Sequence, residues 1–151
     1  MKTMTVVLFL VLAVYTSVSQ SLNIKPGSTT EADKDKYNMT ANFPVIDFGP
    51  EALMGVRGIA DDINGTIMKI VNGQFVPFKQ QALEDTMNCP QNESTLEINY
   101  TTVYKDNGYL CFVFETFSNP RCAAHPMTFQ TSFNYSYTGK GLLDISDLFT
   151  P

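Results

Sequence analysis

Between Leu96 and Tyr137 the sequence alternates apolar and polar residues with a period of two. Turn sequences interrupt this pattern: KDNG at 105–108, SNPR at 118–121 and TGKG at 138–141. A period of two places successive side chains on opposite faces of a strand, and an Asn-Gly turn joins neighbouring antiparallel strands. The region therefore predicts an antiparallel β-meander with one apolar face.

The segment before this meander has a helical period instead. Its apolar residues recur every three or four positions: Val56, Ile59, Ile63, Ile67 and Ile70. This spacing puts them on one side of a helix. The Asn-Gly pair at 72–73 predicts the end of that helix, and Pro77 predicts the start of a second, short one over 77–87. With an opening strand at 42–48, we expect an α+β fold of two layers, a β-meander packed on one long amphipathic helix.

The first residues predict a signal peptide. Lys2 precedes an apolar run over 3–14, and small residues at Ser17 and Ser19 form a cleavage signal, so we expect a secreted, extracellular protein cut after Ser19, or alternatively after Ser21. No later run is long enough for a membrane span. The polar, alternately charged stretch Lys25–Lys36 predicts a flexible mature N-terminus over 20–41, followed by one domain over 42–151.

The formal net charge is −5, and no basic patch with interleaved aromatic residues occurs, so we do not expect a nucleic-acid partner. The number of glycosylation sequons exceeds what the composition would give by chance. Their asparagines are Asn38, Asn64, Asn92, Asn99 and Asn134. The period-two pattern places Asn99 and Asn134 on the polar side of their strands, which favours glycosylation over an accidental match.

Three cysteines leave one without a partner inside the chain. We expect a disulfide between Cys89 and Cys122, because both lie in proline-containing loops, with Cys111 buried inside a strand. An intermolecular bridge is the alternative.

His125 is the only histidine in the chain, so every hypothesis that needs an imidazole must use it. Nucleophilic catalysis would need a nucleophile and an orienting acid beside it. A zinc site would combine it with Cys122 and the other cysteines, and glycoside hydrolysis would use carboxylates instead, such as those of Glu97, Glu115, Asp144 and Asp147. No motif supports any of these, and Pro126 holds His125 in an extended backbone. We expect a structural role for His125, with no catalytic residue, metal or cofactor.

A series of short motifs, in order, resembles the extracellular domain family of the bacterial anti-sigma factor RsiV, which also occurs in the deacetylase PdaC. The opening FPVI strand at 43–46 and the helix around Ile63-Asn64 fit its beginning. The later motifs are Ala124-His125-Pro126, Phe133-Asn134-Tyr135, Thr138-Gly139-Lys140 and Asp147-Leu148-Phe149. Two departures are visible: family members continue into a second half, and Cys122 stands where glycine is common.

The resemblance implies an α+β binding domain, since the RsiV domain binds lysozyme and the chemistry of PdaC belongs to another domain. It carries no catalytic residue over to this chain. We therefore expect a secreted, non-catalytic domain that binds an extracellular protein or glycan, with lysozyme as the specific candidate. The alternatives are a small secreted hydrolase that uses His125 with an acidic residue, and a fragment of a longer protein.

Overall fold

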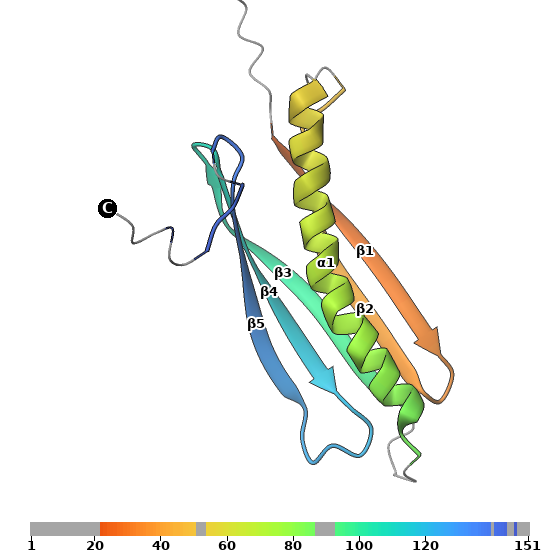
Figure 1. Ribbon diagram of the computed structural model, residues 1–151. Coiled ribbons are helices and arrows are strands. Elements are labelled where there is room, and N and C mark those ends of the chain that lie inside the picture. Colours follow the sequence, from red (N-terminus) through yellow and green to blue (C-terminus); the bar gives the residue numbers. More distant parts are fainter. Residues whose placement is uncertain (1–21, 51–53, 87–92, 140, 145–146, 148–151) are drawn as a thin grey trace, which may run out of the picture.

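The computed structural model describes residues 22–50, 54–86, 93–139, 141–144 and 147. Its main chain forms one mixed sheet packed against one long helix, so the expected α+β fold in two layers is confirmed (Figure 1). The strands are β1 (Asn23–Asp33), β2 (Tyr37–Asp47), β3 (Ser94–Asp106), β4 (Tyr109–Asn119), β5 (Met127–Ser136) and β6 (Gly141–Leu142), and the helix is α1 (Met54–Glu84). The strands lie in the sheet in chain order.

The meander from β3 to β6 is antiparallel throughout, as its period predicts. Its first turn has Asn107 and Gly108 at φ of 50° and 86°, which is the left-handed pair that an Asn-Gly hairpin turn requires. The sheet as a whole is mixed, because β2 pairs with β3 in parallel. A parallel pair needs a long crossover, and α1 supplies it between the two strands.

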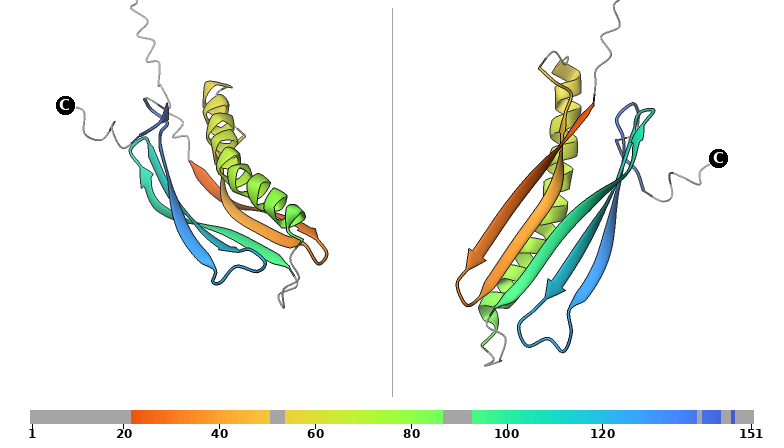
Figure 2. Two further views of the ribbon diagram at one scale, coloured as in Figure 1. Left: turned by 60° about the horizontal axis from the view of Figure 1, so that its bottom comes forward. Right: turned by 180° about the vertical axis from the view of Figure 1, so that it is seen from behind.

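Strands β2 and β3 pair only between Tyr37–Ala41 and Ser94–Ile98, and then diverge. The sheet therefore has two parts: the β1–β2 hairpin and the β3–β6 meander (Figures 1 and 2). Helix α1 packs mainly on β2 and to a lesser degree on β3. The buried residues of the helix are Ala60, Ile63, Ile67, Val71, Phe75, Phe78 and Ala82, and they face a sheet core centred on Phe112, Phe114 and Phe133.

The prediction of a flexible segment at Lys25–Lys36 was wrong, because strand β1 and the turn into β2 occupy it. β1 lies at the edge of the sheet and needs few apolar residues, so its polar composition resembles that of a solvated tail. Asp35 takes a left-handed φ of 62° in the turn that follows. Strand β2 also begins earlier, at Tyr37, than the predicted residue 42.

The predicted break at residues 72–73 and the second helix were also wrong, because α1 runs on through Asn72, Gly73 and Pro77 to Glu84. Pro77 has no N–H for the carbonyl of Gly73, which costs the helix a hydrogen bond. The apolar stripe nevertheless continues on both sides of Pro77 with Phe75 and Phe78, which are 6% and 7% exposed. Packing against the sheet therefore outweighs the local signals.

Candidate functional site

His125 lies in the exposed loop between β4 and β5. Its Nδ1 is 3.2 Å from the carbonyl oxygen of the adjacent Pro126, which is a local contact within the loop. The loop is fastened to the sheet at another residue: the backbone N–H of Arg121 donates to the hydroxyl of the buried Ser94, at 2.9 Å. His125 therefore has the surroundings of a loop residue.

The cysteines differ in state. Cys122 is disulfide-bonded, while Cys111 is free and half-buried in β4, where burial raises the pKa of its thiol. The predicted partner of Cys122, Cys89, lies outside the described residues, so that pairing stays a prediction. Cys122 has a left-handed φ of 66°, a conformation that glycine adopts more readily than other residues. This gives a physical reason for the glycine common at this position in the family that the chain resembles.

The second group of motif residues lies at the opposite end of β5. The backbone N–H of Tyr137 donates to the carbonyl of Gly108 at 2.8 Å. A Cβ on Gly108 would come within 2.3 Å of the Thr138 hydroxyl, so the two turns fit together only with glycine there. Asp147 closes a further turn, since its carboxylate accepts from the Asp144 N–H at 2.9 Å.

Ala124-His125-Pro126 and Thr138-Gly139 thus bracket strand β5, which at ten residues is roughly 30 Å long. Lys140, Leu148 and Phe149, the other predicted motif residues, lie outside the described residues. The contacts of the motif residues at the two ends of β5 hold turns in place, while Phe133 is buried in the core and Tyr135 donates to Asp62 of α1.

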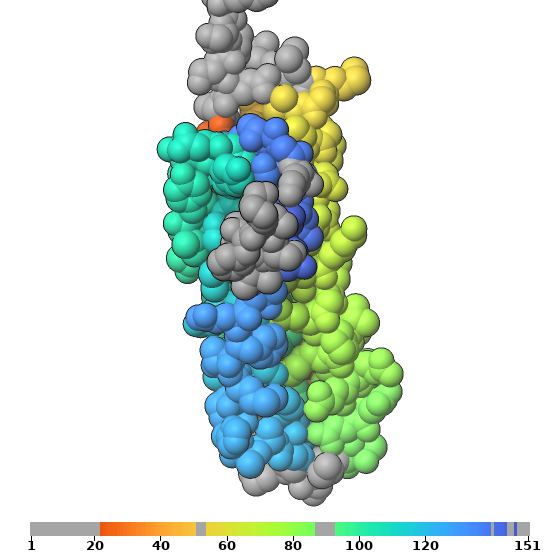
Figure 3. Space-filling model, turned by 60° about the vertical axis from the view of Figure 1, so that its left-hand side comes forward, coloured from red at the N-terminus to blue at the C-terminus, as the bar shows by residue number. Residues whose placement is uncertain are grey.

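The described part of the chain contains a groove between the C-terminal half of α1 and the β4–β5 loop, with a volume of about 710 Å³ (Figure 3). This lies within the size range of ligand sites, about 300–1,000 Å³. Prolines, amides and a few charges line it: Pro77, Gln80, Gln81, Glu84, Asp85, Thr86, Pro120, Arg121, Cys122, Ala123 and Met127. Arg121 lines this groove, and its Nε is buried without a hydrogen-bond partner among the described residues.

Two apolar residues of β5 are exposed beside this groove. Met127 and Phe129 pair with Ser118 and Thr116, whose side chains are buried under α1, so they lie on the same inner face of the sheet. They are nevertheless 52% and 44% exposed, because the helix packs on β2 and β3. The period of two predicts their face correctly. It cannot show how far across the sheet the helix reaches.

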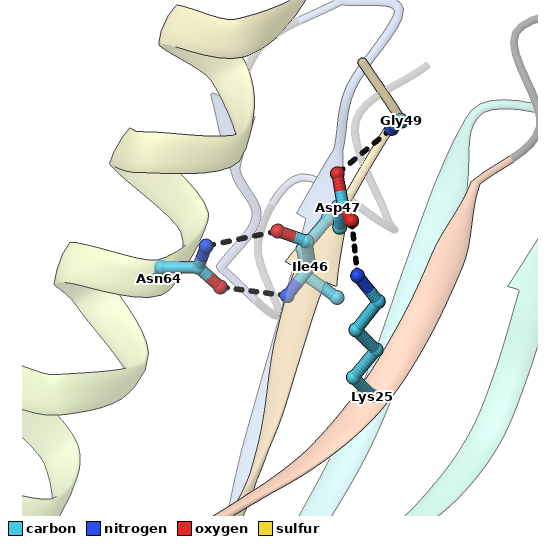
Figure 4. A network of polar contacts seen from close by, with 5 residues as sticks. All are labelled: Lys25, Ile46, Asp47, Gly49 and Asn64. Atoms are coloured by element: carbon cyan, nitrogen blue, oxygen red, sulfur yellow. Dashed lines mark hydrogen bonds and ion pairs between the residues drawn. The ribbon is translucent and has the colours of Figure 1, made fainter.

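A network of polar contacts connects α1 to the β1–β2 hairpin, away from β5 (Figure 4). The side chain of Asn64 donates to the carbonyl of Ile46 at 3.0 Å and accepts from its N–H at 2.8 Å. These are backbone groups of β2 at the point where β3 has diverged. Asp47 accepts from the Gly49 N–H and pairs with Lys25 of β1, and the hydrogen bond from Lys25, followed by that from Gly49, lowers the pKa of the Asp47 carboxyl.

This network bears on the predicted glycosylation of Asn64. A glycan replaces one hydrogen of the Asn64 side-chain amide, and that amide is held between α1 and β2. We therefore expect no glycan there in the folded protein. Asn38, Asn99 and Asn134 differ, since the strand registers put all three on the outer face of the sheet, away from α1. Asn92 lies outside the described residues.

The carboxylates considered for glycoside hydrolysis do not form an enclosed pair. Glu97 and Glu115 lie diagonally on adjacent strands of the outer face, where both are exposed, and Glu115 accepts from Gln130. Asp144 and Asp147 share the turn beyond β6. No group of three His, Cys, Asp or Glu residues able to hold a metal occurs among the described residues. The described part of the chain also has no helix long and apolar enough to cross a membrane.

No family model matches the sequence, and no curated protein is significantly similar to it. Several solved structures have a similar fold, and two of them are crystal structures of DUF3298 proteins. A DUF3298 family protein from Pseudomonas aeruginosa PAO1 aligns over 85% of this chain and 56% of its own, with a TM-score of 0.51 and 9% identity. A DUF3298 family member from Bacteroides fragilis NCTC 9343 aligns over 88% and 62%, with a TM-score of 0.54 and 13% identity.

At these identities the likeness concerns the fold alone, and this chain spans about three fifths of the length of either structure. It extends over the β1–β2 hairpin, α1 and the meander taken together, since it covers most of the chain. The chain thus has a fold similar to that of part of a DUF3298 protein.

Proposed function

We propose that the protein is a secreted, non-catalytic binding domain of the RsiV type that captures an extracellular protein or glycan in the groove beside β5. The observation that carries this proposal is the open inner face, where Met127 and Phe129 are exposed next to the groove. Apolar side chains with a few polar groups among them are typical of binding sites.

The fold similarity to DUF3298 proteins supports this proposal, because that domain occurs in RsiV-like and PdaC-like proteins. Lysozyme is accordingly the specific ligand to test. The outer face of the sheet carries three exposed or half-exposed sequon asparagines, Asn38, Asn99 and Asn134. If these are glycosylated, as we propose, the glycans cover the outer face and leave the inner groove as the accessible protein surface.

The binding test is a calorimetric titration of the purified chain with lysozyme. Ala123→Arg places a long charged side chain in the groove, and we expect it to weaken binding at least tenfold. The matched control is Ala32→Arg, at an exposed position of β1 outside the groove, which should bind like the unmodified chain. Absence of heat at micromolar concentrations would remove lysozyme as the ligand, and equal weakening by both variants would remove the groove as its site.

The hydrolase alternative makes a different prediction for His125. If His125 were catalytic, His125→Ala would abolish a measured hydrolytic activity without changing the thermal unfolding midpoint. The contact of His125 with Pro126 instead leads us to expect an unchanged ligand affinity and at most a small loss of stability.

A further inference from the structure

The outer edge of β5 is open over most of its length among the described residues. β6 pairs only with Tyr135 and Ser136. The carbonyl of Asn134 points toward that edge, since it accepts from the Leu143 N–H at 2.8 Å. Backbone groups alternate in direction along an antiparallel strand, so Thr128, Gln130 and Ser132 also present their N–H and C=O groups to the edge.

This edge lacks the features that usually prevent strand pairing. β5 contains no charged residue and no proline, and it pairs with β4 without a bulge. An uncharged, regular edge strand with exposed apolar residues is a template for another strand.

We propose that the β5 edge is the interface of a homodimer, in which the β5 strands of two copies pair antiparallel about a two-fold axis at Gln130. The two ends of the open edge support a second copy as the occupant. At one end Pro126 offers no N–H, and at the other the carbonyl of Asn134 is already bonded to Leu143. Gln130 lies midway between these two residues. A two-fold axis at Gln130 therefore places Pro126, which has no N–H to donate, opposite the partner's Asn134, whose carbonyl is already bonded.

The same axis pairs Thr128 with the partner's Ser132 through outward-facing groups, as an isologous interface requires. On the inner face it places Phe129 opposite the partner's Thr131 and Met127 opposite the partner's Phe133. Both exposed apolar residues of β5 would then be covered. Since β5 is uncharged, two acidic copies can meet there without repulsion between interface side chains.

The test is sedimentation velocity of the purified chain from micromolar to sub-millimolar concentration. We expect a monomer–dimer equilibrium for the unmodified chain. Thr128→Lys with Ser132→Lys sets like charges opposite each other at both symmetric positions, and should weaken the dimer at least tenfold. Thr128→Lys with Ser132→Glu sets opposite charges there, and should restore it. Thr128 and Ser132 are both exposed, so neither double variant should disturb the core, and circular dichroism checks the fold.

A monomer at every concentration would overturn the proposal. So would a dimer that both double variants leave unchanged, since it would use another surface, and so would equal loss in both, since the register would be wrong. The dimer would cover Met127 and Phe129, which also border the proposed ligand groove, so sedimentation is run without lysozyme and its result is compared with the separate titration of Ala123→Arg. Loss of the dimer with lysozyme binding retained would overturn only the dimer, and a dimer without lysozyme binding would overturn only the proposed function.

Discussion

The two edges of the sheet are built in opposite ways. β1 carries Lys25, Pro26, Glu31 and Asp33, while β5 carries no charge and no proline. Two of the three charged residues of β1 form ion pairs with residues elsewhere in the fold: Lys25 pairs with Asp47, and Glu31 pairs with Lys79 of α1. β5 is held by its ladder to β4 and by aromatic packing, and its outer edge is left open.

Pro26 lies in β1 at a position whose backbone nitrogen faces away from β2. The backbone N–H and C=O of Ile46 in β2 point away from β1, toward Asn64. Backbone direction alternates from residue to residue, so Pro44, two residues before, also points away from β1. Its register partner Pro26 correspondingly points away from β2. The nitrogen of Pro26 therefore faces the open side, where it removes a donor that another strand would use. The β1 edge therefore lacks a donor at Pro26, whereas the β5 edge is open over most of its length among the described residues.

The largest expected effect concerns the two hydrogen bonds between the Asn64 side chain and the backbone of Ile46 in β2. Asn64→Ala leaves the N–H and C=O of the buried Ile46 without partners, which should lower the free energy of unfolding by about 2–4 kcal/mol. Asn72→Ala, at an exposed position of the same helix, is the control for helix propensity and should be neutral or slightly stabilising. Urea unfolding measures both, and equal stabilities would contradict a closing role for Asn64.

A smaller effect is expected on the β5 side, where the hydroxyl of Tyr135 bonds to α1. Tyr135 donates to the Asp62 carboxylate at 2.7 Å, and Tyr135→Phe should cost about 1 kcal/mol. Burial, and secondarily Asp62, raises the pKa of the Tyr135 hydroxyl to about 12. A raised pKa gives stability that is present below the ordinary value of 10.0 and lost as pH rises toward 12.

The stability advantage of the unmodified chain over Tyr135→Phe should therefore shrink between pH 10 and 12. An advantage that stays constant across this range would show that Tyr135 does not titrate as the buried contact requires.

The ion pair on β1 predicts a loss of stability at the acid end instead. The hydrogen bond from Lys79, and secondarily that from Tyr37, lowers the pKa of Glu31 below 4.5. A lowered pKa gives stability that is present above 4.5 and lost as pH falls through the folded-state value. Thermal unfolding of the unmodified chain and of Glu31→Gln should therefore converge below pH 4.5. A difference that persists in acid would contradict the pairing.

The smallest expected effect tests the edge proline itself. Pro26→Val restores a donor on the open side of β1, and should produce weak self-association. The variant is best made together with Thr128→Lys and Ser132→Lys, so that pairing through β5 does not mask the result. Light scattering should show a modest rise in average mass with concentration, and a constant mass would show that the charges alone protect β1.

Sequence patterns predict the meander well, because its faces follow a period of two and Asn107-Gly108 fixes a turn through left-handed backbone angles. Sequence patterns fail to predict elements whose structure depends on contacts with residues that are distant in the sequence. The sequence of β1 resembles that of a solvated tail, because the residues that pair with its charges, Asp47 and Lys79, are distant in the sequence. Pro77 signals a helix start, yet Phe75 and Phe78 anchor both sides of it to the sheet.

The candidate site was predictable only in part. His125 is conspicuous as the single histidine, but the structure places it in a loop at the opposite end of β5 from Thr138 and Gly139. Arg121, Met127 and Phe129 carry no distinguishing motif, because their exposure depends on which strands α1 covers. No local pattern gives the parallel pairing of β2 and β3 that sets the position of the helix.

Amide hydrogen exchange, followed residue by residue at low and high protein concentration, tests the contrast between the two edges most directly. The outward amides of Gln130 and Ser132 on β5 should exchange more slowly as concentration rises, while those of Ser28 and Thr30 on β1 should not change. Exchange at β5 that is independent of concentration, or protection that appears equally on both edges, would contradict the account.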